Sequence, residues 1–558
     1  MQEGTIKLSK NESIKESSEG LAGTIAEVYS GEASHFDDPD MQLLKFHGTY
    51  QQDDRDLRAE RRKAKLDKAW SFMVRAKIPG GLLTAEQFLS MIEIGRGLAN
   101  DSVRITSRQG IQFHGVGKEN LKGVMRAIHE ARLTTLGACG DLNRNTMCCP
   151  VADLDWRRGL GMGELCNQIA DHFTPRATAY WEIWCDGEKW GEKLTRQTEE
   201  PIYGKAYLPR KFKMAVCLPE DNCVDVYTQD LGAEAVHEDG RLLAYDLIVG
   251  GGMGFTHGQE KTFPRLGSRL LRVPPADALA VIETIFKVQR DHGNRSDRKL
   301  ARMKYLIETR GEDWFKQEIF SRIGKEYPDA GPMPEYKVGD HLGWNEGPED
   351  KLFVGIHVAN GRLADGESGA LLTGMREVVE RFRPEVRLTA RQNVVLAGID
   401  PADQAEVQRM LDANGLSTNG EPPNLRRLAM ACVALPTCHL ALAEAERQMP
   451  TLLDQLEDLG VAAEPVELRM TGCPNSCVRS PMSEIGLVGR GPGKYAVYLG
   501  GNQEGTRLAF SFKERVDESE LGGMISRLIQ AWRRETGRGV SFGDWARAKG
   551  GETLAELI

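Results

Sequence analysis

The sequence lacks any uninterrupted apolar run near the roughly 20 residues that a membrane-spanning helix needs. It also lacks the apolar stretch of a secretory signal, because its first twenty residues, MQEGTIKLSKNESIKESSEG, are polar. Positive charge is not in excess: the formal net charge is −9, which argues against a general nucleic-acid binder. These absences predict a protein without membrane or nucleic-acid partners, located in the cytoplasm or an equivalent reducing compartment.

The chain is long enough for several compact units. It has 558 residues, of which 41% are hydrophobic and 27% charged, an ordinary globular composition. Three or more units that each bury a core are expected at this length. The first forty residues are rich in Ser, Glu, Lys and Asp and have little apolar period. This segment is therefore predicted to be an arm that is flexible or packs on a partner.

An internal repeat is visible in two twelve-residue segments. Residues 104–115 read RITSRQGIQFHG and residues 387–398 read RLTARQNVVLAG, with the Arg, Thr, Arg-Gln and final Gly in register. Both segments predict a strand followed by a turn at the glycine. Gln112 and His114 of the first segment correspond to valine and alanine in the second. A single polar site surviving from a twofold arrangement would give this difference.

Two fainter pairs extend the repeat to a larger unit. DLNRNTMCCP is paired with TGCPNSCVRSP, and LIVGGG with VYLGGN. PTLLDQLEDLG and GGMISRLIQAWRRETG have helical patterns, and KYAVYLGG has a strand pattern. The mixture predicts an α+β fold.

Four of the eleven cysteines form a separate pattern. Cys432 and Cys438 are spaced C-x5-C, and after a long gap Cys473 and Cys477 are spaced C-x3-C. A helix is predicted after Pro436, which would put Cys438 in its first turn, where the helix dipole favours a thiolate. Tetrahedral zinc and unrelated buried thiols are both open readings. An iron–sulfur cluster fits best, because its ligands tolerate unequal spacing and a Gly-Pro turn supplies N–H groups.

The chain resembles the siroheme and 4Fe-4S sulfite and nitrite reductases from about Leu21 to its C-terminus. The resemblance rests on GTIAE, FHGTYQQDDRDLRAER, RITSRQGIQFHG, YLPRKFK, QRDHGNRSDRK, CVALPTCHLALAEAER, MTGCPNSC and EIGLVGRGPGKYAVYLGGNQEGTR. It implies that all four cysteines bind the 4Fe-4S cluster and that Cys477 also bridges to the siroheme iron. It also implies six-electron reduction of sulfite to sulfide, as in sulfate assimilation and cysteine biosynthesis.

The resemblance further assigns cationic residues to the substrate. Arg75, Arg144, Lys211 and Lys213 match substrate residues of the family. By themselves, Lys211 and Lys213 would share one face of a strand over residues 208–219, where two lysines are usually only solvated. Residues that match positions near the siroheme are Arg104, Arg108, Gln112, His114, Arg210 and Asn475. Surface roles for Arg104 and Arg108 stay open on sequence alone.

The same resemblance suggests the architecture. It implies two ferredoxin-like-type repeat halves and two larger α/β cofactor-binding units around a shared siroheme site. The predicted segments are an N-terminal arm for possible partner docking, a first repeat half, a first siroheme and substrate domain, a second repeat half, and a 4Fe-4S cluster and siroheme domain: 1–64, 65–136, 137–337, 338–411 and 412–558.

The electron donor is predicted to be a separate protein, because the sequence shows no flavin or NADPH domain. An NADPH-oxidising flavoprotein carrying FAD and FMN is expected, with ferredoxin as the alternative. Two other functions remain open: a nitrite reductase of the same fold, and a non-catalytic scaffold that binds zinc through the four cysteines.

Overall fold

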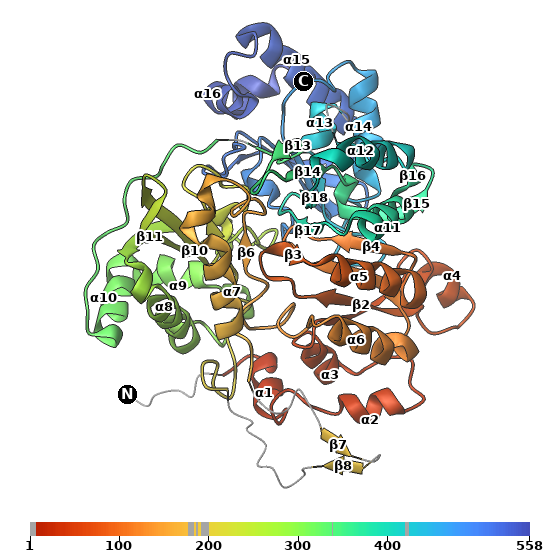
Figure 1. Ribbon diagram of the computed structural model, residues 1–558, viewed down its shortest axis with the longest axis vertical. Coiled ribbons are helices and arrows are strands. Elements are labelled where there is room, and N and C mark those ends of the chain that lie inside the picture. The colour runs from red at the N-terminus through yellow and green to blue at the C-terminus, as the bar shows by residue number, and fades with distance from the viewer. Residues whose placement is uncertain (1–6, 177–182, 186–187, 191–199, 338, 419–422) are drawn as a thin grey trace.

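The computed structural model describes residues 7–558 except 177–182, 186–187, 191–199, 338 and 419–422 (Figure 1). Helices and sheets alternate along the chain, and α1 (Lys10–Glu16) lies at the opposite end of the molecule from the C-terminus. Four sheets of five or six strands carry most of the core, and a two-stranded sheet joins β7 (Ile183–Cys185) to β8 (Glu188–Trp190). The fold is α+β, as the sequence predicts.

Two of the large sheets form the ferredoxin-like halves. The first has the strand order β1-β2-β5-β4-β15-β16, and the second has the order β13-β14-β18-β17-β3. Helices α5 and α6 belong to the first half and α11 and α12 to the second (Figure 1). The strands are β1 (Thr49–Asp53), β2 (Trp70–Ala76), β3 (Leu82–Leu83), β4 (Ser102–Ile105), β5 (Ile111–Val116), β13 (Gly343–Glu346), β14 (Leu352–Ile356), β15 (Arg362–Gly366), β16 (Gly369–Ala370), β17 (Glu385–Leu388) and β18 (Val394–Ile399); the helices are α5 (Ala85–Leu98), α6 (Leu121–Glu130), α11 (Leu371–Phe382) and α12 (Gln404–Ala413).

The two halves exchange strands. β15, from the second half, pairs with β4 of the first, and β3, from the first half, pairs with β17 of the second. Their apolar side chains form one continuous core, which includes Phe88, Ile105, Val354 and Leu396. Neither sheet is complete without the other half of the chain.

The twelve-residue repeat is a hairpin in both halves, not a strand that ends at the glycine. Strands β4 and β5, and likewise β17 and β18, flank a tight turn. The Thr106 hydroxyl accepts from the N–H groups of Arg108 and Gly110 at 3.2 and 3.1 Å. Thr389 accepts from the equivalent N–H groups two and four residues later, at 3.2 and 3.0 Å. The repeated threonine thus makes the turn, because its hydroxyl satisfies backbone donors that the strands leave unpaired.

The two larger units share one sheet topology. The orders β6-β9-β10-β11-β12 and β19-β20-β21-β22-β23 both consist of three parallel strands followed by two antiparallel ones. The strands are β6 (Met147–Cys148), β9 (Met214–Cys217), β10 (Leu231–Glu238), β11 (Arg241–Val249), β12 (Ser268–Val273), β19 (Met430–Ala431), β20 (Leu468–Thr471), β21 (Ile485–Gly491), β22 (Lys494–Leu499) and β23 (Phe510–Asp517). The repeat therefore extends through the whole chain.

This topology corrects one of the faint sequence pairings. LIVGGG ends β11 and VYLGGN ends β22, so that pairing is confirmed. The segment DLNRNTMCCP leads into β6, however, and its counterpart is the segment around β19, not TGCPNSCVRSP, which follows β20. The two segments share Asn and Cys residues, which suggested the pairing. Equivalent segments are those at the same place in the strand order, and local composition does not show this.

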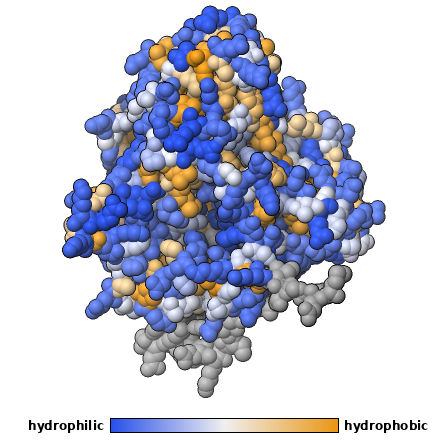
Figure 2. All heavy atoms as spheres, turned by 180° about the vertical axis from the view of Figure 1, so that it is seen from behind, coloured by the Kyte–Doolittle hydropathy of each residue, from blue (hydrophilic) through white to orange (hydrophobic). Residues whose placement is uncertain are grey.

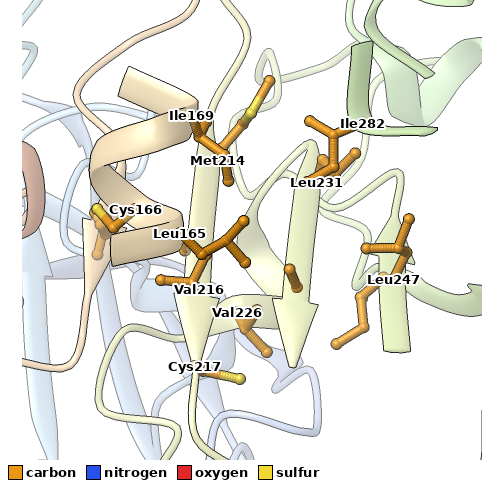
Figure 3. Packing of buried hydrophobic residues seen from close by; sticks show 14 of the residues in the cluster. Leu165, Cys166, Ile169, Met214, Val216, Cys217, Val226, Leu231, Leu247 and Ile282 are labelled. Carbon is orange, nitrogen blue, oxygen red and sulfur yellow. The ribbon is translucent and has the colours of Figure 1, made fainter. Parts of the chain in front are cut away.

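Helices close the faces of the larger sheets. Side chains of α7 (Met162–His172) and α8 (Ala278–His292) meet those of β9, β10 and β11, as Leu165, Met214, Leu231 and Ile282 show (Figure 3). The remaining helices of the two larger units are α9 (Met303–Arg310), α10 (Glu312–Ile323), α13 (Asn424–Leu428), α14 (Gln448–Asp458), α15 (Glu518–Thr536) and α16 (Phe542–Ala555). α14, α15 and β22 lie where the patterns predict them.

The described part of the N-terminal segment is packed on the body of the protein, so the expectation of a flexible arm is wrong for these residues. It forms α1 (Lys10–Glu16), α2 (Ile25–Ser30) and α3 (Asp38–Leu44). The buried Lys15 ammonium donates to Glu12 at 2.6 Å and to the Leu208 carbonyl at 2.7 Å. The polar composition gave a wrong prediction because polar side chains of this segment, such as Lys15, are buried and paired with partners far away in the sequence.

The surface is mainly polar. Hydrophilic side chains cover most of the face in Figure 2, and hydrophobic ones lie between them in separate groups. Among the described residues, no helix combines the length and the apolar character needed to cross a membrane. The boundaries predicted between the five segments stay a prediction.

Candidate functional site: four thiols beside a cationic cavity

The four cysteines come from the loops after two neighbouring parallel strands. Cys432 directly follows β19, and Cys473 and Cys477 follow β20. Cys438 does not lie in a helix, which corrects the prediction: the loop continues until α14 begins at Gln448. The Cys438 N–H donates to Ala434 O at 2.9 Å across a turn with Ala434 in the left-handed region. The backbone therefore makes a single turn here and does not continue as a helix.

Backbone N–H groups point at the sulfur atoms. Gly472 N donates to Cys432 Sγ at 3.3 Å. The backbone N–H groups of Leu440 and Ala441 donate to Cys438, and the backbone N–H of Asn475 donates to Cys473. Burial and the neighbouring thiols raise the pKa of Cys432 well above its usual value and that of Cys473 to about 12. Four thiolates in this place therefore need a strongly positive group to stabilise them.

The width of this thiol group fits a cluster better than a single ion. A tetrahedral zinc ion with bonds of about 2.0–2.3 Å draws its ligand atoms to roughly 3.3–3.8 Å from one another. In the part of the chain that the structure describes, one group of three or more such ligands lies within 4.8 Å, and it does not contain these four cysteines. Four thiols with N–H donors around a wider space suit a 4Fe-4S cluster.

A cavity of about 370 Å³ opens beside Cys477, whose side chain is exposed to it. No acidic residue is among the 19 that line it, and eight are cationic: Arg108, Arg210, Lys211, Lys213, Arg298, Lys299, Arg302 and Arg479. Asn475 also lines it. Such a cavity suits a ligand with many negative charges.

Three buried aspartates that do not line the cavity bind three of its arginines. Asp141 accepts from Arg298 at 2.6 and 2.8 Å, and Asp230 accepts from Arg302 at 2.9 and 2.7 Å. Asp225 pairs with Arg479. The two-bond pairing fixes the guanidinium planes of Arg298 and Arg302. Arg479 is also fixed, because its other nitrogens donate to Ser107 O and Ala390 O.

The two lysines precede the strand instead of lying on it. β9 begins at Met214, and the N–H of Lys213 donates to Asp230 at 2.9 Å. Among the described residues, neither Lys211 nor Lys213 has a partner for its ammonium group. Burial, followed by neighbouring cations, lowers the pKa of both well below the usual lysine value. Each can therefore give up a proton more readily than an exposed lysine.

Arg75 and Arg144 lie next to each other. Both guanidinium groups donate to Ala138 O at 3.2 Å. Arg75 and Gln112 are paired across β2 and β5, and the Gln112 amide oxygen accepts from Arg75 Nε at 2.9 Å. Arg144 N donates to Phe212 O at 2.9 Å, between the two lysines in sequence. Backbone pairing therefore brings the predicted substrate arginines close to the lysines.

The residues expected near the siroheme divide into two groups. Arg108, Arg210 and Asn475 line the cavity. Arg104 instead pairs with Glu446 and donates at 2.9 Å to the carbonyl of Ala431, the last residue of β19, directly before Cys432. His114 is buried, and desolvation and nearby arginines hold its pKa well below the usual range. Both are on the first ferredoxin-like sheet but do not line this cavity.

Sequence reasoning missed several cavity residues. Arg298, Lys299 and Arg302 follow α8, and Arg479 follows the last cysteine. The dense cationic run between residues 295 and 304 was the available signal. The pairing of Arg302 with Asp230 across 72 residues could not be read from it.

Comparisons with known proteins agree with this site. The profile of the nitrite and sulphite reductase 4Fe-4S domain matches residues 166–327, and that of the nitrite/sulfite reductase ferredoxin-like half domain matches 67–131 and 345–414. The first match lies in the first large unit, and the four cysteines lie in the second. The chain belongs to the nitrite and sulphite reductase family.

Within that family, the chain is similar to proteins named sulfite reductase (NADPH) hemoprotein beta-component. That of Staphylococcus haemolyticus is 43% identical, over 98% of this chain and 95% of the relative, and that of Shewanella sp. (strain ANA-3) is 43% identical over 97% and 96%. The solved structure of the Mycobacterium tuberculosis NirA protein matches with a TM-score of 0.78 at 25% identity, over 98% and 97%. The resemblance seen in the sequence is confirmed.

Gly472 provides a test of the thiol group. A side chain at this position would lie 2.5 Å from Ala443 O and 2.6 Å from Ala434 Cβ, so Gly472→Ala must shift the loop whose N–H faces Cys432. We expect the purified variant to lose at least half of its iron and acid-labile sulfide. Gly491→Ala, with nothing within 4 Å, is the matched control and should keep the wild-type content. Equal content in both variants would contradict the role of this loop.

Proposed function

We propose that this protein reduces sulfite to sulfide with six electrons, using a siroheme coupled to a 4Fe-4S cluster. The observation that carries the proposal is the exposure of Cys477, one of the four grouped thiols, to a cavity lined by eight cations. The relatives that share 43% identity with the chain are named sulfite reductases. Cysteine biosynthesis by sulfate assimilation is the pathway that this activity serves.

The residues present fit both groups. Cys432, Cys438, Cys473 and Cys477 would hold the cluster, with Cys477 shared with the siroheme iron. Arg108, Arg210 and Asn475 would bind the siroheme carboxylates, which need positive and hydrogen-bonding partners. Arg104, Gln112 and His114 would support the site from the adjoining sheet. When bound, these groups supply electron transfer and a metal centre for the oxyanion.

The protein's own contribution is binding and proton supply. Arg75 and Arg144 present guanidinium N–H groups that bind an oxyanion in pairs of hydrogen bonds. Lys211 and Lys213 add positive charge, and their lowered pKa values make them suited to give protons to oxygen atoms that leave as water. An anion in the cavity favours their charged forms, so substrate binding recharges the proton donors.

The electrons come from a partner. An NADPH-oxidising flavoprotein that carries FAD and FMN is favoured, because the beta-component relatives are named for NADPH. Ferredoxin is the alternative donor. The N-terminal segment remains the proposed docking element, and the cytoplasm the proposed location.

Two other functions have less support. A nitrite reductase of the same fold would use the same cations, and comparing turnover of the two anions distinguishes it. A zinc scaffold built on the four cysteines is disfavoured, because these thiols are not gathered as one ion requires. A colourless preparation with zinc in place of iron would establish it.

Replacing Cys477 tests the coupled site. Cys477→Ser should abolish sulfite reduction and remove the magnetic coupling between siroheme and cluster, because the shared sulfur is lost. Electron paramagnetic resonance and sulfide release measure the two effects. The matched control is Cys166→Ser, a buried thiol on α7 outside the site, which should keep both properties. Six-electron turnover by Cys477→Ser would refute the bridging role.

Lys213→Ala tests proton delivery. We expect kcat for sulfite to fall by about 10²-fold or more, the usual size of a general-acid contribution, with iron and siroheme content unchanged. The exposed Lys205 provides the control, since Lys205→Ala should change kcat less than about twofold. Loss of the siroheme from Lys213→Ala would instead indicate a structural role.

Removal of residues 1–8 tests docking of the flavoprotein. The shortened protein keeps α1 and its buried Glu12 and Lys15, which a forty-residue deletion would remove. NADPH-driven turnover through the flavoprotein should fall, and turnover with a small chemical reductant should not. Docking at this end would be contradicted if shortening left both turnover rates unchanged, or if it lowered both rates equally.

A further inference from the structure

A second group of metal-ligand side chains lies outside the cationic cavity. Cys149, Asp221, Cys223 and His341 each offer one ligand atom, and these atoms all lie within 4.8 Å of one another. Three of the four residues are buried and His341 is nearly so. None of them takes part in the function proposed above.

Their separations match those of ligands around one ion. Cys149 Sγ is 3.0 Å from Asp221 Oδ2 and 3.7 Å from His341 Nε2, and His341 Nε2 is 3.2 Å from the same Asp221 oxygen. Metal bonds of about 2.0–2.3 Å in a tetrahedron require roughly 3.3–3.8 Å between ligands. Shifts of a few tenths of an ångström would therefore bring Cys149, Asp221 and His341 to these separations, and Cys223 Sγ lies within 4.8 Å of all three ligand atoms.

Two members of this group occupy positions in the first large unit that are equivalent, through the internal duplication, to positions of the cluster cysteines in the second. Cys149 directly follows β6, as Cys432 follows β19. Met147 pairs with the second residue of β9, and Met430 pairs with the second residue of β20, so the registers agree. Cys223 lies as far beyond the end of β9 as Cys477 lies beyond the end of β20. The first large unit thus presents thiols at the positions where the second large unit presents cluster ligands.

His341 comes from the other side, in the connection that leads into β13. Its φ of 56° is in the left-handed region, which residues with a side chain adopt only when the surrounding structure holds them there. Its carbonyl lies against Gly355 of β14, where a Cβ would be 1.8 Å away. The backbone is therefore fixed to the second ferredoxin-like half while the imidazole reaches Asp221 in the first large unit.

We propose that Cys149, Asp221, Cys223 and His341 bind one divalent zinc ion as a structural site. Two thiolates, an imidazole and a carboxylate are ligands that zinc accepts, and four protein ligands close its tetrahedron. The three anionic ligands leave one negative charge on the complex, and the Arg157 guanidinium, which is also paired with Asp155, approaches it with Nη1 3.8 Å from Asp221 Oδ2. The ion links the first large unit to the second ferredoxin-like half.

An entry path for the ion exists. A cavity of about 260 Å³ is lined by Arg157, Asp221 and His341 and reaches the exposed Lys337. This path is separate from the cationic cavity, with which it shares no lining residue.

The test is elemental analysis and zinc X-ray absorption of the full chain purified from zinc-supplemented medium. We expect about one zinc for every five irons, four of them from the cluster and one from the siroheme. The zinc shell should contain two sulfurs at about 2.3 Å and two nitrogen or oxygen atoms at about 2.0–2.1 Å. Less than about one zinc per ten chains, or a shell of four sulfurs, which is the signature of the cluster cysteines, would overturn the proposal.

Variants separate the ligands from other buried groups. Cys223→Ser and His341→Asn should each lower the zinc content at least fivefold, while Cys166→Ser should retain it. Iron content is measured in the same samples, so failure of the siroheme proposal and failure of the zinc proposal are distinguishable. Unchanged zinc in both ligand variants, or a Cys149–Cys223 disulfide found by mass spectrometry of the native protein, would contradict the site. Should the variants not fold, the wild-type absorption spectrum still decides.

Discussion

The cationic cavity depends on the pairing of buried aspartates with arginines behind its wall. Asp141, Asp225 and Asp230 are buried, and each binds at least one guanidinium that lines the cavity. A buried arginine without such a partner would be costly, and a carboxylate inside the cavity would repel an anion. Placing the carboxylates behind the cations solves both problems. In this arrangement Lys211 and Lys213, among the described residues, line the cavity without a carboxylate partner.

The duplication explains why one cavity can use both halves of the chain. Segments from the first large unit supply the lysines and most arginines, and the second large unit supplies Cys477 and Arg479. The hairpin turns of the ferredoxin-like sheets point to the same region: Ser107 donates to Cys477 O at 2.8 Å, and Arg479 donates to Ser107 O at 3.1 Å. The equivalent loops of the two copies differ in their side chains: one pair carries four thiols, and the other carries two thiols and Asp221, with His341 beside them.

The sequence predicted those features that local chemistry determines. The four-cysteine pattern, the repeated hairpin segments and the helices of the last unit needed only spacing and composition. The loop around Cys438 was predicted to be helical because Thr437 is a plausible N-cap and residues 444–447 continue a helical pattern. N–H donation to sulfur, and a hydrogen bond of 2.6 Å from Arg55 to Ala441 O, favour the loop instead. Lys211 and Lys213 were placed on a strand because Phe212 and Met214 alternate with them.

Long-range pairing set the limit of prediction. Arg298 with Asp141, Arg302 with Asp230 and Lys15 with Leu208 O join residues 72 to 193 positions apart. No periodicity in the sequence indicates such contacts, so the segment that contains α1 was predicted to be an arm that is flexible or packs on a partner. The group around His341 was hidden for the same reason, since its histidine lies more than 100 residues from its nearest ligand partner in sequence.

The reciprocal exchange of β3 and β15 has a consequence for biosynthesis. When a ribosome has made the first 340 residues, the β4 edge still has no neighbour, and β3 has no sheet to join. An unpaired sheet edge is prone to association with other chains. The nascent protein therefore stays incomplete until its second half emerges, and the two halves must mature together instead of one after the other.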